Sequence, residues 1–270
     1  MMLKSLDNLK VFLSADDHLQ LALFLSDQAK SIKWLKGWLP PDYDHKNIYA
    51  LLTRLKRRQF ISQTGRGQFQ LSAIGRDRLF RLYPLLAGKP LDSGYFFTAI
   101  VDFGNNGPAS RQKKAGHMAT LKVRPSIGGY GNVFSGRRLE LMKVFRRWGW
   151  GRLTRGIYLS GSKLAANALD EYLAAFRLTE LVTRGMLAIN ENQKRLADRI
   201  FNLSPRNSDW RLIIDRINEW ERIGRREKGL RLIRKDFLML LVTEPLLPDD
   251  LLPEPYWMEE AVKIINQCHQ

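Results

Sequence analysis

The chain has 270 residues and a formal net charge of +17, from 44 Lys and Arg against 27 Asp and Glu. This length predicts two or three domains, and a hydrophobic content of 44% is enough for packed cores, which excludes a wholly disordered chain. The excess of positive charge indicates a polyanionic partner, for which nucleic acid is the first hypothesis and an acidic membrane surface is the rival.

The distribution of apolar residues and cysteine indicates a cytoplasmic protein. No apolar run approaches the roughly 18–20 residues that cross a bilayer, so no membrane partner is expected. Charged residues interrupt the first 17 positions, which is unlike a signal peptide. Cys268 is the single cysteine, so neither an internal disulfide nor a cysteine zinc site can form. We therefore expect a cytoplasmic, nucleoid-associated protein.

The first expected elements are two helices, over residues 17–29 and 31–38, where apolar residues recur at helical spacing. A Pro-Pro pair at 40–41 ends the second of them. Asp44 is then a suitable N-cap for a third helix, over residues 44–58.

The third expected helix has an apolar face and a basic face. Four apolar residues recur at i, i+3, i+4 and i+7, which predicts that one face is buried. Asn47 and Arg54 are the expected base readers, because Asn pairs with adenine and Arg with guanine through two hydrogen bonds. The later basic residues would contact phosphates. The buried residues are expected to be Ile48, Leu51, Leu52 and Leu55, and the DNA contacts Lys46, Asn47, Tyr49, Thr53, Arg54, Lys56, Arg57 and Arg58.

Two short strands joined by a tight turn are predicted next. Residues 60–61 and 69–71 are apolar and bracket a Gly-Arg-Gly tip at 65–67. Arg66 at this tip suits a narrow minor groove, and Gln68 beside it completes the expected DNA-binding set. A helix followed by a basic hairpin is typical of a winged helix-turn-helix that binds duplex DNA. The alternative is an ordinary solvated basic helix.

A middle domain that mixes helix and strand is predicted over residues 89–189. Its first strand, residues 95–103, is apolar and β-branched. Residues 104–136 then contain seven glycines, five basic residues and no acid, which predicts a long loop. This loop would either wrap a phosphate backbone or be an insertion without a binding role. Its basic residues are Arg111, Lys113, Lys114, Lys122 and Arg124, and the elements expected after it are helices over 137–148 and 162–176 and strands over 152–160 and 178–187.

The expected fold class is α+β, with three domains. A helix over residues 72–83 closes the first of them, so residues 1–88 form the expected winged-helix domain. The middle domain follows, and residues 190–270 form an all-helical C-terminal domain. The helices of this last domain are expected over 193–202, 208–225, 229–243 and 258–268.

Three stretches of the sequence carry a resemblance to a known family. They are T-R-L-K-R-R-Q-F-I-S-Q-T-G-R-G-Q-F-Q-L-S-A-I-G (Thr53 to Gly75), R-R-L-E-L-M-K-V-F-R-R-W-G-W-G-R-L-T-R-G-I-Y-L-S (Arg137 to Ser160) and L-L-V-T-E-P-L-L-P-D-D-L-L-P-E-P-Y-W (Leu240 to Trp257). A weaker fourth match is N-Q-K-R-L-A-D-R-I-F-N-L, from Asn192 to Leu203. In their order and spacing, these stretches resemble the PaaX-type family of bacterial transcriptional repressors.

The resemblance implies a cytoplasmic repressor with a winged helix, a ferredoxin-like middle domain and a helical C-terminal domain. Its partners would be a double-stranded DNA operator and a second copy of the chain in a homodimer. Known members respond to aryl-acyl-CoA thioesters, so an acyl-CoA-type effector is expected. The family has a short acidic turn after the first middle-domain strand, whereas this chain has the basic stretch 104–136 as an insertion. No cofactor and no catalytic residue are expected.

Two other functions stay open. Asp102 ends the first middle-domain strand, where ferredoxin-like nucleases of CRISPR adaptation carry a metal-binding Asp. A metal-dependent nuclease is therefore one alternative, although the next carboxylate in the sequence is Glu140. The four histidines show no metal-ligand spacing. The other alternative is an architectural protein that coats DNA without sequence preference.

Overall fold

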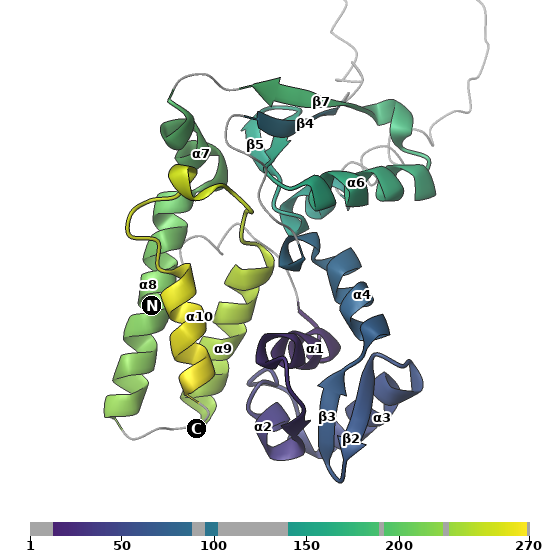
Figure 1. Ribbon diagram of the computed structural model, residues 1–270, viewed down its shortest axis with the longest axis vertical. Helices are drawn as coiled ribbons and strands as arrows, with labels where there is room; N and C mark the ends of the chain where they lie inside the picture. Colours follow the sequence, from purple (N-terminus) through teal and green to yellow (C-terminus); the bar gives the residue numbers. More distant parts are fainter. Residues whose placement is uncertain (1–12, 88–94, 102–139, 189–191, 224–226, 269–270) are drawn as a thin grey trace, which may run out of the picture.

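The computed structural model describes residues 13–87, 95–101, 140–188, 192–223 and 227–268 (Figure 1). Within these residues the protein has two antiparallel sheets, helices around them and a group of C-terminal helices. The α+β class predicted from the sequence is therefore confirmed. No helix in the described residues is long and apolar enough to cross a membrane.

The first sheet lies among the N-terminal helices, at the lower right of Figure 1. Its strand order is β1-β3-β2, and both pairs are antiparallel. The third predicted helix starts later than expected, because residues 45–47 form a 3-10 turn in which the Lys46 N–H donates to Asp44 Oδ1 at 3.0 Å. The elements are α1 (Ala15–Ser26), β1 (Lys30–Ser31), α2 (Ile32–Lys36), η1 (His45–Asn47), α3 (Ile48–Arg57), β2 (Ile61–Gly65), β3 (Gln68–Leu71), α4 (Ala73–Leu82) and η2 (Pro84–Leu86).

The second sheet has the strand order β5-β6-β4-β7, and every neighbouring pair is antiparallel. Helix α6 (Lys163–Ala175) and the helical residues 140–147 share an apolar core with one of its faces. Helix α7 (Gln193–Phe201) packs on the opposite face through Ile200 and Phe201. The strands are β4 (Tyr95–Val101), β5 (Gly151–Thr154), β6 (Ile157–Ser160) and β7 (Val182–Ala188), with η3 (Thr179–Leu181) before the last.

One strand prediction in this sheet is wrong. Residues 152–160, expected to form a single strand, instead form most of the β5–β6 hairpin. Gly156 at the turn has φ of 86°, a left-handed conformation that glycine adopts without steric cost. The turn lets one short stretch supply two neighbouring strands of the sheet.

The C-terminal helices α8 (Leu203–Arg222), α9 (Glu227–Val242) and α10 (Met258–Gln267) lie side by side at the left of Figure 1. Helix α8 begins five residues before the predicted position at Ser208. The cause is Asn202, whose φ of 54° ends α7 and lets α8 start at once. A 3-10 turn, η4 (Asp249–Leu251), lies between α9 and α10.

The N-terminal and C-terminal elements share one apolar core, which includes Trp38. This side chain is 1% exposed, and its ring lies 6.5 Å from the ring of Phe237 on α9 in an edge-to-face arrangement. The Arg234 guanidinium stacks 5.0 Å over the Trp38 ring, and its Nη1 donates to the carbonyl of Gly37 at 2.8 Å. These contacts fix the first sheet and α3 relative to α9.

His18 of α1 belongs to the same junction and is held neutral. It is 1% exposed, and its Nδ1 lies 3.1 Å from the carbonyl oxygen of Trp38. A carbonyl oxygen only accepts hydrogen bonds, so Nδ1 carries the proton and donates it. Burial lowers the pKa of His18 from 6.5 to about 4.

We predict that the fold loses stability as the pH falls from 6.5 towards 4. In this window the unfolded chain protonates His18 and the folded chain does not, so protons favour unfolding. A pKa depression of this size corresponds to about 3 kcal/mol. Thermal unfolding midpoints of the wild type and His18→Gln, measured across this pH range, provide the test. The variant's midpoint should change less with pH, and an equal change in both proteins would contradict the prediction.

Candidate nucleic-acid interface

Helix α3 buries the face that the sequence predicts. Its four apolar residues are at most 3% exposed and pack in one cluster with α1, α2 and the β2–β3 hairpin. A fully buried aliphatic side chain stabilises the fold by roughly 1.5–3 kcal/mol, so this cluster holds α3 in one orientation. The buried residues are Ile48, Leu51, Leu52 and Leu55.

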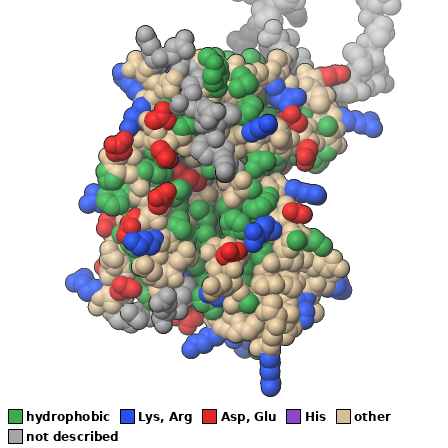
Figure 2. Space-filling model, viewed as in Figure 1, with side chains coloured by type: hydrophobic (Ala, Val, Ile, Leu, Met, Phe, Trp, Pro, Cys, Tyr) green, Lys and Arg blue, Asp and Glu red, His purple; other side chains and the backbone are tan. Residues whose placement is uncertain are grey.

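The side chains predicted to contact DNA lie on the outside. All ten are exposed, and Tyr49 reaches 63%. Figure 2 shows basic side chains projecting from the lobe that carries the N-terminal elements. Exposure makes these residues available to a partner, and their contact with DNA stays a prediction. They are Lys46, Asn47, Tyr49, Thr53, Arg54, Lys56, Arg57, Arg58, Arg66 and Gln68.

The end of α3 places the hairpin beside the helix. Gln59 has φ of 59°, and the N–H groups of Gln59 and Phe60 donate to the carbonyls of Lys56 and Leu55 at 2.8 and 3.0 Å. This hydrogen-bond pair is the Schellman motif, which turns the chain sharply at a helix C-terminus. Lys56 Nζ also donates to Gln63 Oε1 of β2 at 2.8 Å. The hairpin is therefore attached to the basic end of α3.

The hairpin tip exposes Arg66. Strands β2 and β3 pair from Ile61 with Leu71 to Gly65 with Gln68, which leaves Arg66 and Gly67 in the turn. Gly67 has φ of 71° and nothing within 4 Å of a Cβ built on it, so backbone conformation rather than space requires glycine here. The two predicted strands and their tip are confirmed.

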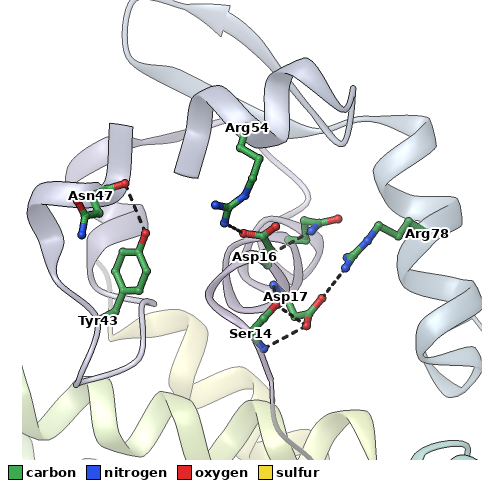
Figure 3. Close-up of polar contacts among 8 residues, drawn as sticks. Ser14, Asp16, Asp17, Tyr43, Asn47, Arg54 and Arg78 are labelled. Carbon is green, nitrogen blue, oxygen red and sulfur yellow. Dashed lines mark hydrogen bonds and ion pairs between the residues drawn. The ribbon is translucent and has the colours of Figure 1, made fainter. Parts of the chain in front are cut away.

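Arg54 is held by an acidic residue that the sequence did not reveal. Its Nη2 donates to the carboxylate of Asp16 on α1, and Figure 3 shows the guanidinium directed towards that carboxylate. The hydrogen bond raises the pKa of Arg54. The two residues are 38 positions apart, so no local pattern could have paired them.

The N-terminal end of α1 has a second ion pair beside this one. Asp17 accepts from the N–H and hydroxyl of Ser14 at 3.1 and 2.7 Å, which completes a capping box with the Asp17 N–H donating to Ser14 Oγ at 3.2 Å. Arg78 of α4 donates to the same carboxylate at 2.9 Å (Figure 3). Asp16 and Asp17 are adjacent on α1. They thus pair with one arginine that precedes the hairpin, Arg54, and with one that follows it, Arg78.

Five other basic residues keep their charge uncompensated. None of them makes an ion pair with a described residue, and residues 45–76 contain no acid. They cluster at the end of α3 and the hairpin tip, with one at the start of the helix, so the local potential is positive. These residues are Lys46, Lys56, Arg57, Arg58 and Arg66.

Several predicted residues lie outside the described part of the chain. Asp102, the metal ligand of the nuclease alternative, follows the last described residue of β4. In the part of the chain that is described, no three His, Cys, Asp or Glu residues are grouped so that they could hold a metal ion. The basic residues of the insertion are also outside it: Arg111, Lys113, Lys114, Lys122 and Arg124.

Comparisons with known proteins identify no family. No protein-family model and no curated protein matches the sequence. Among solved structures, an uncharacterized protein from Mycobacterium tuberculosis is similar at a TM-score of 0.49 and 15% identity, over 87% of this chain and 83% of that chain. A likeness at this level carries no argument about function.

We predict that Gly75→Ala destabilises the protein and Gly65→Ala does not. A Cβ at Gly75 would lie 2.0 Å from the carbonyl oxygen of Phe60, where α4 starts against the hairpin, whereas at Gly65 the nearest atom is 3.9 Å away. Overpacking of this kind costs ~1–3 kcal/mol. Urea unfolding midpoints of the two variants provide the measurement, and equal midpoints would contradict the geometry.

Proposed function

We propose that the chain is a sequence-specific DNA-binding transcriptional regulator, a repressor of PaaX type. Helix α3 would enter the major groove and the β2–β3 hairpin would contact the adjacent backbone or minor groove. The observation that supports this most is the outer face of α3. There Lys56 and Arg57 make no ion pair with a described residue, and Arg54 is paired with Asp16 alone, while the inner face is buried.

The arrangement of the N-terminal elements supports a winged helix over residues 1–88. The elements follow one another as α1, β1, α2, α3, β2 and β3. Their three strands form one sheet in the order β1-β3-β2. In this layout the third helix is the recognition helix and the β2–β3 hairpin is the wing. Arg66 then lies at the wing tip and Asn47 at the start of the recognition helix.

The second sheet supports a ferredoxin-like middle domain over residues 89–189. Its elements follow the order strand, helix, strand, strand, helix, strand, which is β4, residues 140–147, β5, β6, α6 and β7. The helices from α7 onwards support an all-helical C-terminal domain over residues 190–270. This layout and the four resembling stretches are the basis for the PaaX assignment.

Arg54 would have to leave Asp16 before it could read a base. An exposed ion pair is worth roughly 0.2–1 kcal/mol, and the Arg54 side chain is 46% exposed. A bidentate contact with guanine discriminates by roughly 1–3 kcal/mol, so the exchange is favourable at the correct base pair. Asp16 would then oppose binding at the wrong base pair, because there Arg54 gains nothing by leaving it.

The proposed partners are an operator, a second copy of the chain and an effector. A homodimer would place two α3 helices in successive major grooves, about 34 Å apart, on an inverted repeat. An acyl-CoA-type effector would release the operator only if it binds the DNA-incompetent arrangement more tightly than the competent one.

Selection from random DNA duplexes tests the proposal. We expect the purified protein to enrich an inverted repeat whose half-sites are about one helical turn apart. Retention of duplexes without any enrichment would contradict a sequence-specific regulator and favour the architectural alternative. Cleavage of labelled duplex in the presence of Mg²⁺, lost in Asp102→Ala, would favour the nuclease instead. Addition of a CoA thioester to the selected complex then tests the effector.

We further predict that replacing Arg57 and Arg58 together by Ala weakens binding to all duplexes alike. Both are expected to contact phosphates, so the slope of log affinity against log salt should decrease by about 2. The matched control replaces Arg195 and Arg199, two exposed arginines of α7, which lies at the far end of the molecule from α3 (Figure 1). Fluorescence anisotropy with the selected operator and a scrambled duplex measures both. An equal loss in the control would show that only net charge matters.

A further inference from the structure

A cavity of about 200 Å³ lies where the second sheet meets the C-terminal helices. One wall comes from β5, β6 and the turn before β5. The other comes from the junction of α7 and α8 and from the residues that follow α9. Helix α7 and β5 are in contact at this place (Figure 1).

The charge of this cavity is positive. Arg146, Arg152 and Arg206 line it, and no acidic residue does. Larger cavities in the described residues have a different character. One of about 560 Å³ between α4 and α6 is lined by one arginine and two acids, and one of about 620 Å³ beside α1 and α10 is lined by four acids and no basic residue. A third cavity, of about 510 Å³ on α7, is lined by two arginines and one acid. Among these four cavities, the smaller one is therefore the one lined by arginines without any acid.

Arg206 is the buried member of this group. It is 5% exposed, its Nη1 donates to Thr243 Oγ1 at 3.2 Å, and the same nitrogen lies 3.6 Å from Glu244 Oε2. Glu244 also accepts from Trp210 Nε1 at 3.0 Å and from the Tyr256 hydroxyl, so its negative charge is shared among three donors. Glu244, behind the wall, is thus the ion-pair partner of Arg206.

Two donors in the walls lack an acceptor. The Nε of Arg206 and the indole Nε1 of Trp150 are buried and make no hydrogen bond with any described residue. Buried donors are satisfied in nearly all native proteins, so a missing acceptor is informative. An oxygen-bearing ligand is the kind of group that would supply one.

The remaining wall is apolar and aromatic. Trp150, Tyr158 and Phe201 line the cavity together with Met142 and Ile200. Such side chains suit the apolar body of a small molecule, while Arg presents a fork of N–H donors that matches a carboxylate or phosphate. The cavity is below the ~300 Å³ that pockets for drug-sized ligands reach, so it is too small to enclose a whole nucleotide.

We propose that this cavity binds a small organic anion, with its carboxylate or phosphate oxygens held by Arg152 and Arg206 and its apolar body against Trp150, Tyr158 and Phe201. The ligand would bridge the second sheet and the C-terminal helices, because its contacts come from both. This proposal does not rest on DNA binding, and the cavity is too small to enclose the whole CoA thioester proposed as effector.

Isothermal titration calorimetry with benzoate tests this proposal, because benzoate joins a carboxylate to a planar apolar body. We expect saturable binding at one site per chain with a Kd on the order of 1 mM, as suits so small a ligand. Benzamide has the same shape without the charge and should bind at least about tenfold more weakly. Inorganic phosphate is the second probe, and its competition with benzoate would identify the oxyanion group as the shared determinant.

Two matched variants locate the site. Arg152→Gln should weaken benzoate binding at least about tenfold. Arg155→Gln removes the same charge from an exposed residue of the same hairpin that does not line the cavity, and should leave binding unchanged. Both residues are exposed, so both variants should fold, and their thermal unfolding midpoints confirm this. The proposal is overturned if neither anion binds saturably, if benzamide equals benzoate, or if Arg155→Gln weakens binding as much as Arg152→Gln.

Discussion

Burial of Trp38 between the N-terminal elements and α9 is the constraint on which the arrangement of this protein depends. The indole contacts Phe237 and lies under the Arg234 guanidinium, and the backbone carbonyl of Trp38 accepts a hydrogen bond from His18 Nδ1. Burial lowers the pKa of both Arg234, to about 9, and His18, to about 4, so the junction places two ionisable groups where charge is disfavoured. The aromatic contacts and hydrogen bonds offset this cost, and α3 receives its orientation from a junction far from its own basic face.

The energetic cost of breaking an ion pair in this molecule depends on how deeply the pair is buried. Arg54 and Asp16 are partly exposed, so solvent screens their attraction and the pair can exchange for another partner at little cost. Arg206 and Glu244 are buried, and removal of either would leave an uncompensated charge in a low-dielectric region. The first pair suits a surface that binds and releases a polyanion, and the second suits the fixed wall of a cavity.

Much of the fold could be predicted from local patterns. The inner face of α3 was predicted residue by residue, because apolar residues that repeat with a 3.6-residue period lie on one face of a helix, and that face becomes buried. The β2–β3 hairpin followed from glycine at its tip, and α4 and α6, which Ser72 and Ser162 cap, lie within the helical ranges that the sequence predicted. The β5–β6 hairpin was missed because short stretches with β-prone residues, such as Thr154 and Ile157, lie on both sides of Gly156 and look like one strand until a partner strand is present. The domain boundaries and the DNA contacts stay predictions.

The sequence by itself determined the α+β class, the positive charge and the amphipathic character of α3, because these depend on composition and on spacing within a few residues. Only the tertiary structure decided which charges meet. It paired Arg54 with Asp16 across 38 positions, brought Arg152 and Arg206 to one cavity, and set Arg234 on Trp38. Such pairs join residues from separate elements, and their distances are fixed by how the apolar faces of those elements pack, which no local pattern encodes.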